Sequence, residues 1–521
     1  MKKLLVALLL FLTVTQYAQA QTKVFKEVGE EISSQVKAIV QDNALVGYLV
    51  FTQLEKASED SFNYKITIMD ENLNDIGAIN FREQKLILQG VSLEQDVLCL
   101  AYLKSNVYGN EFQTKKKVRA AIIDPKDFVF TQFLSLNGKI LNTNSIKVEI
   151  KYTVDPFGRK NIWTADGKLQ HNIQIKNIPG RGFACFYGDE RKNNLVIFNP
   201  DGRLGWQRPI KEDAKAFGLM SSGQDVYLLM KQKDKMLEGG YELLGFNIKD
   251  TAVYPKYVLK DKQGNSLKVI TFANDPVTGK PYISGTILNP RKTNDYETGK
   301  QLTKGTYLGV FTVSLESHKK GGFIENYSYW ADGAAAGISK KGLFMEDGTY
   351  GRYDLSFKDY QGNTYFIGSG VHKQVKWGAI ISSVLTAPFI IPPMILLGLG
   401  TQKCKVKDAV LLKQGPKGAL ALEGTIPADK THFVPAKVLL DAYDNRVYYN
   451  VTNADTKSDY VVMGDIKNFV IYNVTQKKVQ RTIPHKDGNI FTTIFPAKEG
   501  HVMVSEYNKK ERYTRVSIEA L

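Results

Sequence analysis

The sequence predicts an all-β protein, a β-propeller of about six to eight blades. Short runs rich in Val, Ile, Leu, Phe and Tyr, separated by turn residues, fill nearly all of the chain after residue 44. A strand–turn–strand unit recurs along it. The 521 residues are 43% hydrophobic and 23% charged, a globular composition that excludes disordered, collagen-like and polytopic membrane proteins.

Residues 1–20 have the pattern of a secretory signal peptide. Lys2 and Lys3 precede an apolar stretch, and Ala18-Gln19-Ala20 is a small-x-small cleavage site. We therefore expect an exported protein, periplasmic or extracellular and at most peripheral to a membrane. The alternative is an uncleaved anchor helix, which the short apolar stretch disfavours.

Residues 21–43 are expected to form a short N-terminal helical segment, with the propeller occupying residues 44–521. The expectation of a helix rests on apolar residues at intervals of three and four, namely Val28, Ile32, Val36 and Ile39.

The recurring unit is an apolar strand, a polar turn with Asp, Asn or Gly, and a second strand that often ends near Ile-Pro. Its copies are YKITIMDENLNDIGAI from Tyr64, NLVIFNPDGRLGWQRPI from Asn194, ELLGFNIKDTAVYPKYV from Glu242, DAVLLKQGPKGALALEGTIP from Asp408 and NFVIYNVTQKKVQRTIP from Asn468. Further apolar runs follow at 96–103, 224–230 and 500–505. Repeats of roughly 40 to 60 residues with four strands each are typical of a propeller.

Turn sequences support repetition. KDKQGN from Lys260 and KDYQGN from Lys358 are separated by about two blade lengths. Asp-Gly pairs mark hairpin turns, because glycine adopts the positive φ that tight turns need. They occur at Asp166, Asp201, Asp347 and Asp487. The alternative fold, tandem β-sandwich domains, suits the length, but no linker-like stretch divides the chain.

Two segments carry a resemblance to a known family. GYLVFTQLEKASEDSFNYKITIMDENLN from Gly47 resembles a family of uncharacterised secreted bacterial proteins thought to be propeller-like. The DAVLLK segment around Val410 is similar to the recurring blade motif of that family. The resemblance implies a propeller fold and no catalytic residues.

Residues 372–403 form an apolar insertion, and residues 377–402 contain no charged residue. The insertion is long enough to cross a bilayer as a helix. Its three prolines, Pro388, Pro392 and Pro393, disfavour a straight helix. A hairpin whose two ends emerge on one side is therefore the better membrane interpretation. A buried core segment and an oligomer interface remain open alternatives.

The candidate contact residues follow from this insertion. Large apolar side chains would insert into a membrane or dock on a partner, and flanking lysines would attract anionic headgroups. They are Trp377, Phe389, Ile390, Met394 and Leu397, with Lys373, Lys376, Lys403 and Lys405.

The formal charge of +16 favours acidic partners: anionic lipid, lipopolysaccharide, acidic polysaccharide or an envelope protein. Export argues against nucleic acid as a partner in vivo. Cys99 and Cys185 lie in apolar runs and are expected to be buried, inert thiols. Oligomeric state is not predictable from these features.

We expect no metal and no cofactor. Asp70, Asn72 and Asn74 have the spacing of the start of a calcium loop, but the loop lacks its required glycine and glutamate, so a hairpin turn explains them better. Motifs of serine hydrolases, zinc peptidases and phosphate-binding loops are absent.

The leading hypothesis is therefore an exported, non-enzymatic binding or scaffold propeller at the cell envelope, attached through residues 377–400. The absence of catalytic motifs leans against an enzyme without deciding the matter. The alternative is an extracytoplasmic polysaccharide hydrolase or lyase at the central mouth of the propeller, which would need an acidic or histidine cluster drawn from several blades.

Overall fold

The computed structural model describes most of the chain after the predicted signal peptide. The described residues are 21–26, 33–41, 44–58, 61–107, 115–150, 152–154, 162–164, 173–188, 193–210, 214–232, 240–249, 251–290, 298–316, 322–333, 335–375, 402–428, 432–435, 444 and 446–521.

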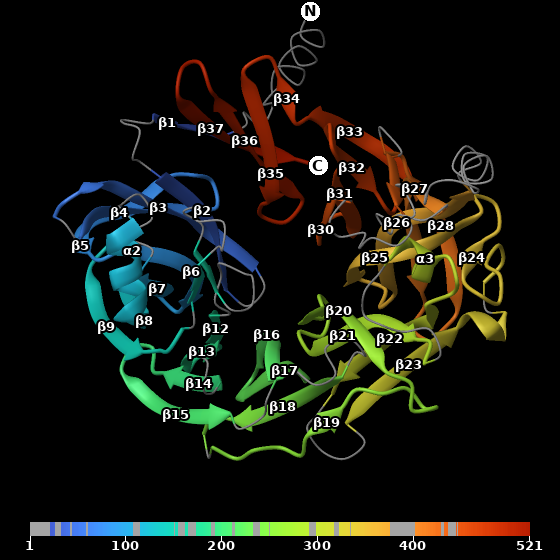
Figure 1. Ribbon diagram of the computed structural model, residues 1–521, viewed down its shortest axis with the longest axis horizontal. Helices are drawn as coiled ribbons and strands as arrows, with labels where there is room; N and C mark the ends of the chain where they lie inside the picture. The colour runs from blue at the N-terminus through green and yellow to red at the C-terminus, as the bar shows by residue number, and fades with distance from the viewer. Residues whose placement is uncertain are drawn as a thin grey trace, which may run out of the picture.

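Eight antiparallel sheets are arranged around a central axis as the blades of a propeller (Figure 1). Blade 1 comprises β2 (Ser33–Gln41), β3 (Ala44–Lys56), β4 (Phe62–Asp70) and β5 (Asp75–Glu83). Blade 2 comprises β6 (Leu86–Glu94), β7 (Val97–Ser105), β8 (Asp127–Ser135) and β9 (Ile140–Lys147). Blade 3 comprises β12 (Gln174–Ile178), β13 (Gly182–Gly188), β14 (Asn193–Phe198) and β15 (Leu204–Ile210). Blade 4 comprises β16 (Ala214–Ser222), β17 (Asp225–Gln232), β18 (Tyr241–Asn247) and β19 (Tyr257–Val258).

The remaining blades complete the ring. Blade 5 comprises β20 (Leu267–Asn274), β21 (Pro281–Leu288), β22 (Tyr307–Leu315) and β23 (Phe323–Tyr329). Blade 6 comprises β24 (Leu343–Phe344), β25 (Thr349–Lys358), β26 (Thr364–Val375), β27 (Gln402–Gln414), β28 (Leu420–Ile426) and β29 (His432–Pro435). Blade 7 comprises β30 (Val447–Asn453), β31 (Ser458–Gly464), β32 (Asn468–Asn473) and β33 (Lys478–Pro484). Blade 8 comprises β34 (Lys486–Asp487), β35 (Ile490–Pro496), β36 (His501–Asn508), β37 (Tyr513–Ala520) and β1 (Gln21–Lys26).

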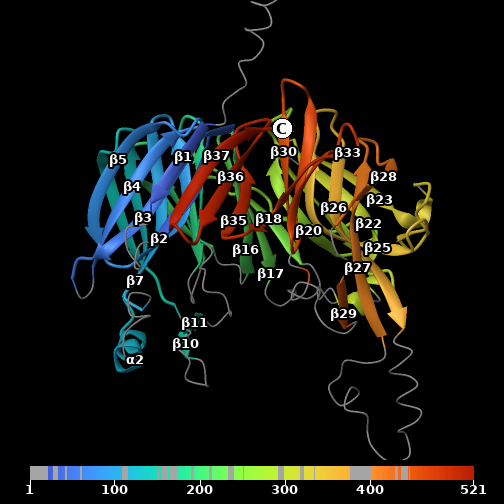
Figure 2. The same cartoon turned by 90° about the horizontal axis from the view of Figure 1, so that it is seen from above.

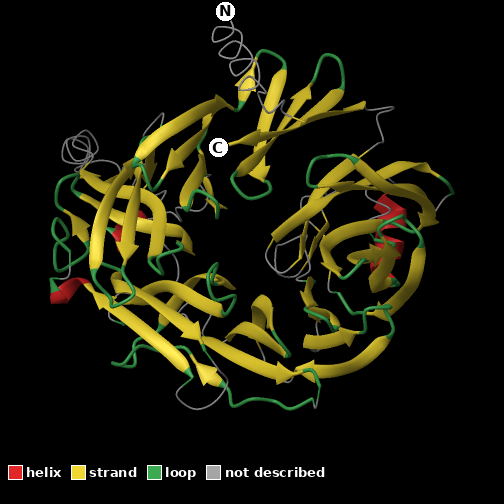
Figure 3. Ribbon diagram, turned by 180° about the vertical axis from the view of Figure 1, so that it is seen from behind, coloured by secondary structure: helices red, strands yellow, loops and turns green. Residues whose placement is uncertain are grey.

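Little else is regular (Figure 3). The other described elements are the hairpin β10 (Tyr152–Val154) and β11 (Ile162–Thr164), the helices α2 (Lys115–Ile123) and α3 (Gly299–Leu302), and the 3-10 turn η2 (Trp330–Asp332). None of the described helices has the length and apolar character needed to cross a bilayer. The predicted all-β propeller is confirmed, with eight blades, and the alternative of tandem sandwiches is not what the chain forms.

The first strand closes the ring. β1 pairs antiparallel with β37, so the outer strand of blade 8 comes from the opposite end of the chain. Blades 8 and 1 also share an apolar cluster, in which Tyr48 and Met69 meet Met503 and Ile518. The pairing covers the edge of β37, and the shared cluster holds the first and last blades together.

The predicted N-terminal helix is wrong. Residues 21–26 form β1 and residues 33–41 form β2, the innermost strand of blade 1. β2 pairs with β3 from Ser33↔Gln53 to Gln41↔Ala44. Few residues of this segment follow the helical spacing. The backbone hydrogen bonds between β2 and β3 stabilise a strand more than this weak periodicity favours a helix.

The repeated sequence unit has one place in the blade. With β25 and β35, the first long strands, counted as the first strands of blades 6 and 8, every quoted copy covers the third and fourth strands. They are β4–β5, β14–β15, β18–β19, β27–β28 and β32–β33. The apolar runs that follow at 96–103, 224–230 and 500–505 belong to β7, β17 and β36, which are second strands. The five copies therefore mark the outer halves of blades 1, 3, 4, 6 and 7.

The two similar turn sequences, KDKQGN and KDYQGN, occupy different places in the fold. KDKQGN connects β19 to β20 between two blades, whereas KDYQGN connects β25 to β26 within one blade. The two copies do not mark equivalent blade positions, so they do not support the repetition that was inferred from them. They share a local turn instead. Asp261 Oδ1 accepts a hydrogen bond from the Asn265 N–H at 2.7 Å, and Asp359 Oδ1 accepts one from the Asn363 N–H at 2.8 Å.

The same turn explains the apparent calcium loop. Asp70 Oδ1 accepts hydrogen bonds from the backbone N–H groups of Asn72 at 2.9 Å and Asn74 at 2.8 Å, and Oδ2 accepts from Asn74 Nδ2 at 2.8 Å. A carboxylate committed to N–H donors is not arranged to bind a cation. The prediction of a hairpin turn is confirmed.

Apolar side chains fill the spaces between blades. Between blades 2 and 3, Phe133 contacts Phe198 with ring centroids 5.2 Å apart, and the buried Cys99 and Cys185 belong to the same cluster. Burial raises the pKa of the Cys185 thiol to about 12, so the prediction of buried, unreactive thiols fits this packing. Gly202, in the predicted Asp201-Gly202 turn, has φ +80°, and an added Cβ would lie 2.4 Å from the Phe133 ring.

Candidate functional site

The ends of the apolar insertion leave the propeller side by side. β26 and β27 form an antiparallel ribbon whose last pair is Val375↔Gln402. Residues on either side of the insertion are therefore neighbours, as a hairpin requires. The predicted contacts Lys376, Trp377, Phe389, Ile390, Met394 and Leu397 lie outside the described residues.

The structure brings the other predicted contacts together. Lys373 on β26 lies opposite Cys404, and Lys403 and Lys405 flank that cysteine on β27. Because strand side chains alternate between faces, Cys404 and Val406 enter the core while Lys403 and Lys405 lie on the other face of β27. Lys373 is exposed, and Lys403 and Lys405 are half-buried.

This ribbon is built into blade 6. Val371, Cys404 and Val406 are buried in the largest core cluster, and β29 pairs with the first part of β27. At the base of the ribbon, Lys407 Nζ donates a hydrogen bond to the Asp347 carbonyl at 2.8 Å. Burial raises the pKa of the Cys404 thiol to about 11, and the Lys373 ammonium opposes this only in part. The base of the ribbon is therefore held by core packing, strand pairing and a hydrogen bond.

A second projection lies on the same side of the ring. Figure 2 shows α2, the β10–β11 hairpin and the β26–β27 ribbon extending from one face of the propeller. α2 has the sequence KKKVRAAII, with Lys116 and Arg119 exposed and Ile123 83% exposed. We call this side, defined by α2 and residues 371–375 and 402–407, the projecting face. Its described side chains include the exposed cations Lys116, Arg119 and Lys373 and the exposed apolar Ile123.

The opposite face opens into a cavity at the central channel. Its volume is about 220 Å³. Most of the lining residues lie near or just beyond the carboxyl-terminal ends of the innermost strands of blades 1 to 5, whereas Val91, Ile175 and Lys176 lie further back along β6 and β12. The described lining residues are Val40, Val91, Ser92, Ile175, Lys176, Asn177, Pro179, Met220, Ser221, Ser222, Gly223, Asn274 and Gly279. We call it the channel pocket. β26 runs antiparallel to β25, the innermost long strand of blade 6. The end of β26, where the ribbon leaves the ring, is therefore on the side opposite the carboxyl-terminal ends of the innermost strands. The channel pocket and the projecting face thus lie on opposite sides of the ring.

Lys176 is the one ionisable residue among those lining residues. Its side chain reaches channel solvent, but surrounding protein lowers the pKa of its ammonium group by desolvation. Nearby Glu94 is held in place by Asn177 Nδ2 at 3.0 Å and by the Gly180 N–H at 2.7 Å. These bonds join blade 2 to blade 3.

The described lining of the channel pocket offers no pair of catalytic carboxylates. Among these residues there is no Asp, Glu or His, whereas most glycosidases use two carboxyl groups that face one cavity. Within the described part of the chain, no group of three His, Cys, Asp or Glu side chains is placed to hold a metal ion. The raised pKa of Asp459, about 7, arises from burial and from the neighbouring Asp359, between blades 6 and 7 and not at the channel pocket.

Sequence reasoning missed the channel pocket. Its residues come from five separate innermost strands, and these are the strands that the repeat pattern does not cover. One local signal was present, because Lys176 interrupts the apolar strand QIKNI. A single lysine in a strand is common, so this signal alone could not have marked a site.

Comparison with known proteins leaves function open. Residues 1–113 match a family described as a family of unknown function, DUF6770. The match includes the quoted segment from Gly47 and ends well before Val410. A search of curated proteins finds no match.

Solved propellers resemble this chain at low identity. The chain is similar to the Dos1 propeller (7% identity, 95% of this chain and 94% of that chain, TM-score 0.43). It is also similar to the WD40 domain of SCAP from fission yeast (8% identity, 96% and 98%, TM-score 0.39). A third similar structure is the β-propeller domain of the Trilobed protease from Pyrococcus furiosus (9% identity, 82% and 92%, TM-score 0.33). The fold of this chain is established by its own strand pairing.

Proposed function

We propose that this protein is an exported, non-enzymatic binding or scaffold propeller of the cell envelope, and that its projecting face docks on an anionic envelope component. The apolar segment 377–400 would enter or rest on that surface. The basic residues of α2 and of the β26–β27 ribbon would supply the electrostatic attraction.

The pairing of Val375 with Gln402 carries this proposal. It favours an insertion that leaves and re-enters the fold at one point over a single membrane crossing. A crossing would place blades 7 and 8 on the other side of the membrane from blades 1 to 5, although all of them form one ring.

The charges on the projecting face are consistent with such a surface. Lys373, Lys403 and Lys405 flank the insertion, and α2 adds Lys116 and Arg119. Each lysine or arginine held near an anionic leaflet contributes about 1 kcal/mol of attraction. Several acting together with inserted apolar side chains would hold the protein at a membrane.

Vesicle flotation tests the proposal. The protein without its signal peptide is mixed with phosphatidylglycerol vesicles or with phosphatidylcholine vesicles. We expect flotation with the anionic vesicles, weakened at high salt. Phe389→Asp with Leu397→Asp should abolish it, and Lys116→Glu with Arg119→Glu should reduce it. Lys139→Glu with Lys478→Glu, on hairpins outside the projecting face, is the matched control. Flotation that none of these changes affects would contradict the proposal.

The test in the native host uses a linker variant. Because Val375 and Gln402 are already paired, a short Gly/Ser linker can replace residues 377–400 without moving the two strands. We expect full-length protein in the membrane fraction and the linker variant, folded, in the soluble fraction. Equal distribution of the two proteins would show that the insertion is not the anchor.

A further inference from the structure

We propose that the channel pocket binds a small hydroxylated carboxylate of about the size of one sugar, such as a uronic acid or the acidic end residue of a glycan. This site lies on the face opposite the projecting face and is independent of the docking proposed above.

The charge of the channel pocket is the first reason. Among the described lining residues, Lys176 is the one that is charged, and no described carboxylate forms an ion pair with it. The buried Glu94 instead accepts hydrogen bonds from Asn177 Nδ2 and from the Gly180 N–H. Lys176 is exposed to solvent within the channel, so its ammonium group is accessible to a ligand, and a carboxylate bound there would form a charge-assisted hydrogen bond with it.

The polar groups beside Lys176 suit a hydroxylated ligand. Ser92 on β6 and Ser221 and Ser222 on β16 line the channel pocket on either side of β12, the strand that carries Lys176. A serine hydroxyl both donates and accepts hydrogen bonds, as a sugar hydroxyl does. Ser221 Oγ already donates to the Asn177 carbonyl at 2.5 Å, which fixes its orientation and leaves its oxygen able to accept.

The apolar lining and the volume of the channel pocket limit the kind of ligand that it can hold. Val91, Ile175 and Met220 add apolar surface to the lining, against which the C–H face of a sugar ring can pack. The volume of about 220 Å³ lies below the roughly 300–1,000 Å³ of pockets for drug-sized ligands. It therefore fits one sugar residue and not an extended chain.

Calorimetric titration tests the proposal, with glucuronate, glucose and inorganic phosphate as ligands. We expect glucuronate to bind and glucose to bind at least about tenfold more weakly, since it lacks the carboxylate. Lys176→Met should weaken glucuronate binding by a similar factor, and Lys176→Arg should retain much of it. Lys139→Met, on an exposed hairpin, is the control that should change nothing.

A second measurement does not depend on variants. Lys176 in the native protein is acetylated with an amine-reactive ester, and the modified lysines are identified by mass spectrometry. Glucuronate should protect Lys176 and leave Lys139 unprotected. The proposal is overturned by equal binding of glucuronate and glucose, by phosphate binding as tightly as glucuronate, by full affinity in Lys176→Met, or by no protection of Lys176.

Discussion

A single buried carboxylate, that of Asp444, contributes to the contact between blades 6 and 7. Between blades 6 and 7, the Asp444 side chain is only 1% exposed and lies 3.5 Å from Arg352 Nη1. Its Oδ2 accepts a hydrogen bond from Ser369 Oγ at 2.5 Å, and Arg446 Nε lies 3.7 Å from Oδ1. One buried carboxylate thus faces two buried guanidinium groups.

Replacing Asp444 with Asn should destabilise the protein strongly. Arg446 would keep its charge without this counter-ion, while Arg352 would retain Asp354, which lies 2.9 Å from its Nη2. Removing one partner of a buried ion pair costs up to about 3–5 kcal/mol. Urea unfolding followed by tryptophan fluorescence measures the change in the free energy of unfolding. Asp201→Asn is the matched control, because Asp201 pairs with Arg203 at the exposed surface. It should cost less than about 1 kcal/mol. Equal effects of the two changes would contradict this assignment.

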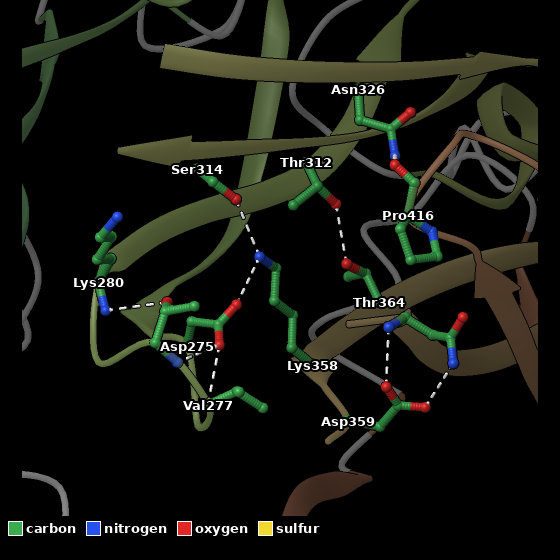
Figure 4. A network of polar contacts seen from close by, with 12 residues as sticks. Asp275, Val277, Lys280, Thr312, Ser314, Asn326, Lys358, Asp359, Thr364 and Pro416 are labelled. Carbon is green, nitrogen blue, oxygen red and sulfur yellow. Dashed lines mark hydrogen bonds and ion pairs between the residues drawn. The ribbon is translucent and has the colours of Figure 1, made fainter. Parts of the chain in front are cut away.

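At the scale of elements, polar contacts hold blade 5 against blade 6. Lys358 Nζ, at the end of β25, donates hydrogen bonds to Asp275 Oδ2 and to Ser314 Oγ, each at 2.9 Å (Figure 4). Thr312 Oγ1 lies 3.1 Å from Thr364 Oγ1. Such contacts have fixed geometry, so they set the register of one blade against the next.

The Asp275 contact predicts a dependence of stability on pH. Burial alone would raise the pKa of Asp275, but hydrogen bonds from Lys358 and from the N–H groups of Thr278 and Val277 lower it overall. A carboxyl whose folded-state pKa is lowered contributes stability above its unfolded-state pKa of about 3.9 and loses it as pH falls through the folded-state value.

Asp275→Asn should therefore cost more stability at neutral pH than in acid. Urea unfolding at about pH 6 and about pH 3 measures the difference between wild type and variant, which should shrink toward acid. Lys358→Met should remove much of the same dependence on pH. A difference that stays constant across this range would show that the ion pair does not contribute.

At the scale of the whole molecule, β1 closes the ring. Six residues, Gln21 to Lys26, pair with β37, and Phe25 packs against the cluster shared by blades 8 and 1. The ring therefore depends on a segment taken from the other end of the chain.

Removing residues 21–26 should open the propeller between blades 8 and 1. Losing a ladder of this length, at about 0.5–1.5 kcal/mol per hydrogen bond, should cost on the order of 3 kcal/mol or more. Limited proteolysis should then cut first in β35 to β37, and thermal unfolding should begin at a lower temperature. Scrambling residues 27–32, which lie outside the described strands, is the control. Unchanged proteolysis after the deletion would mean that β1 is not needed for closure.

The sequence by itself determined the local units. Apolar runs separated by polar turns predicted strands, and every copy of the repeat proved to be the outer half of a blade. The turn at Asp201-Gly202 was predictable because glycine alone adopts its φ of +80° without strain. The insertion after Lys376 could be recognised in the sequence because a long run without charged residues is evident from composition alone.

Tertiary structure decided what depends on contacts between distant segments. Residues 33–41 became a strand and not a helix because β3 offered a complete hydrogen-bond ladder. The blade number and the use of β1 to close blade 8 follow from packing around the ring. This packing cannot be recognised from the residue pattern of any single strand. The channel pocket exists only where innermost strands of five blades converge around Lys176, and no local pattern encodes such convergence.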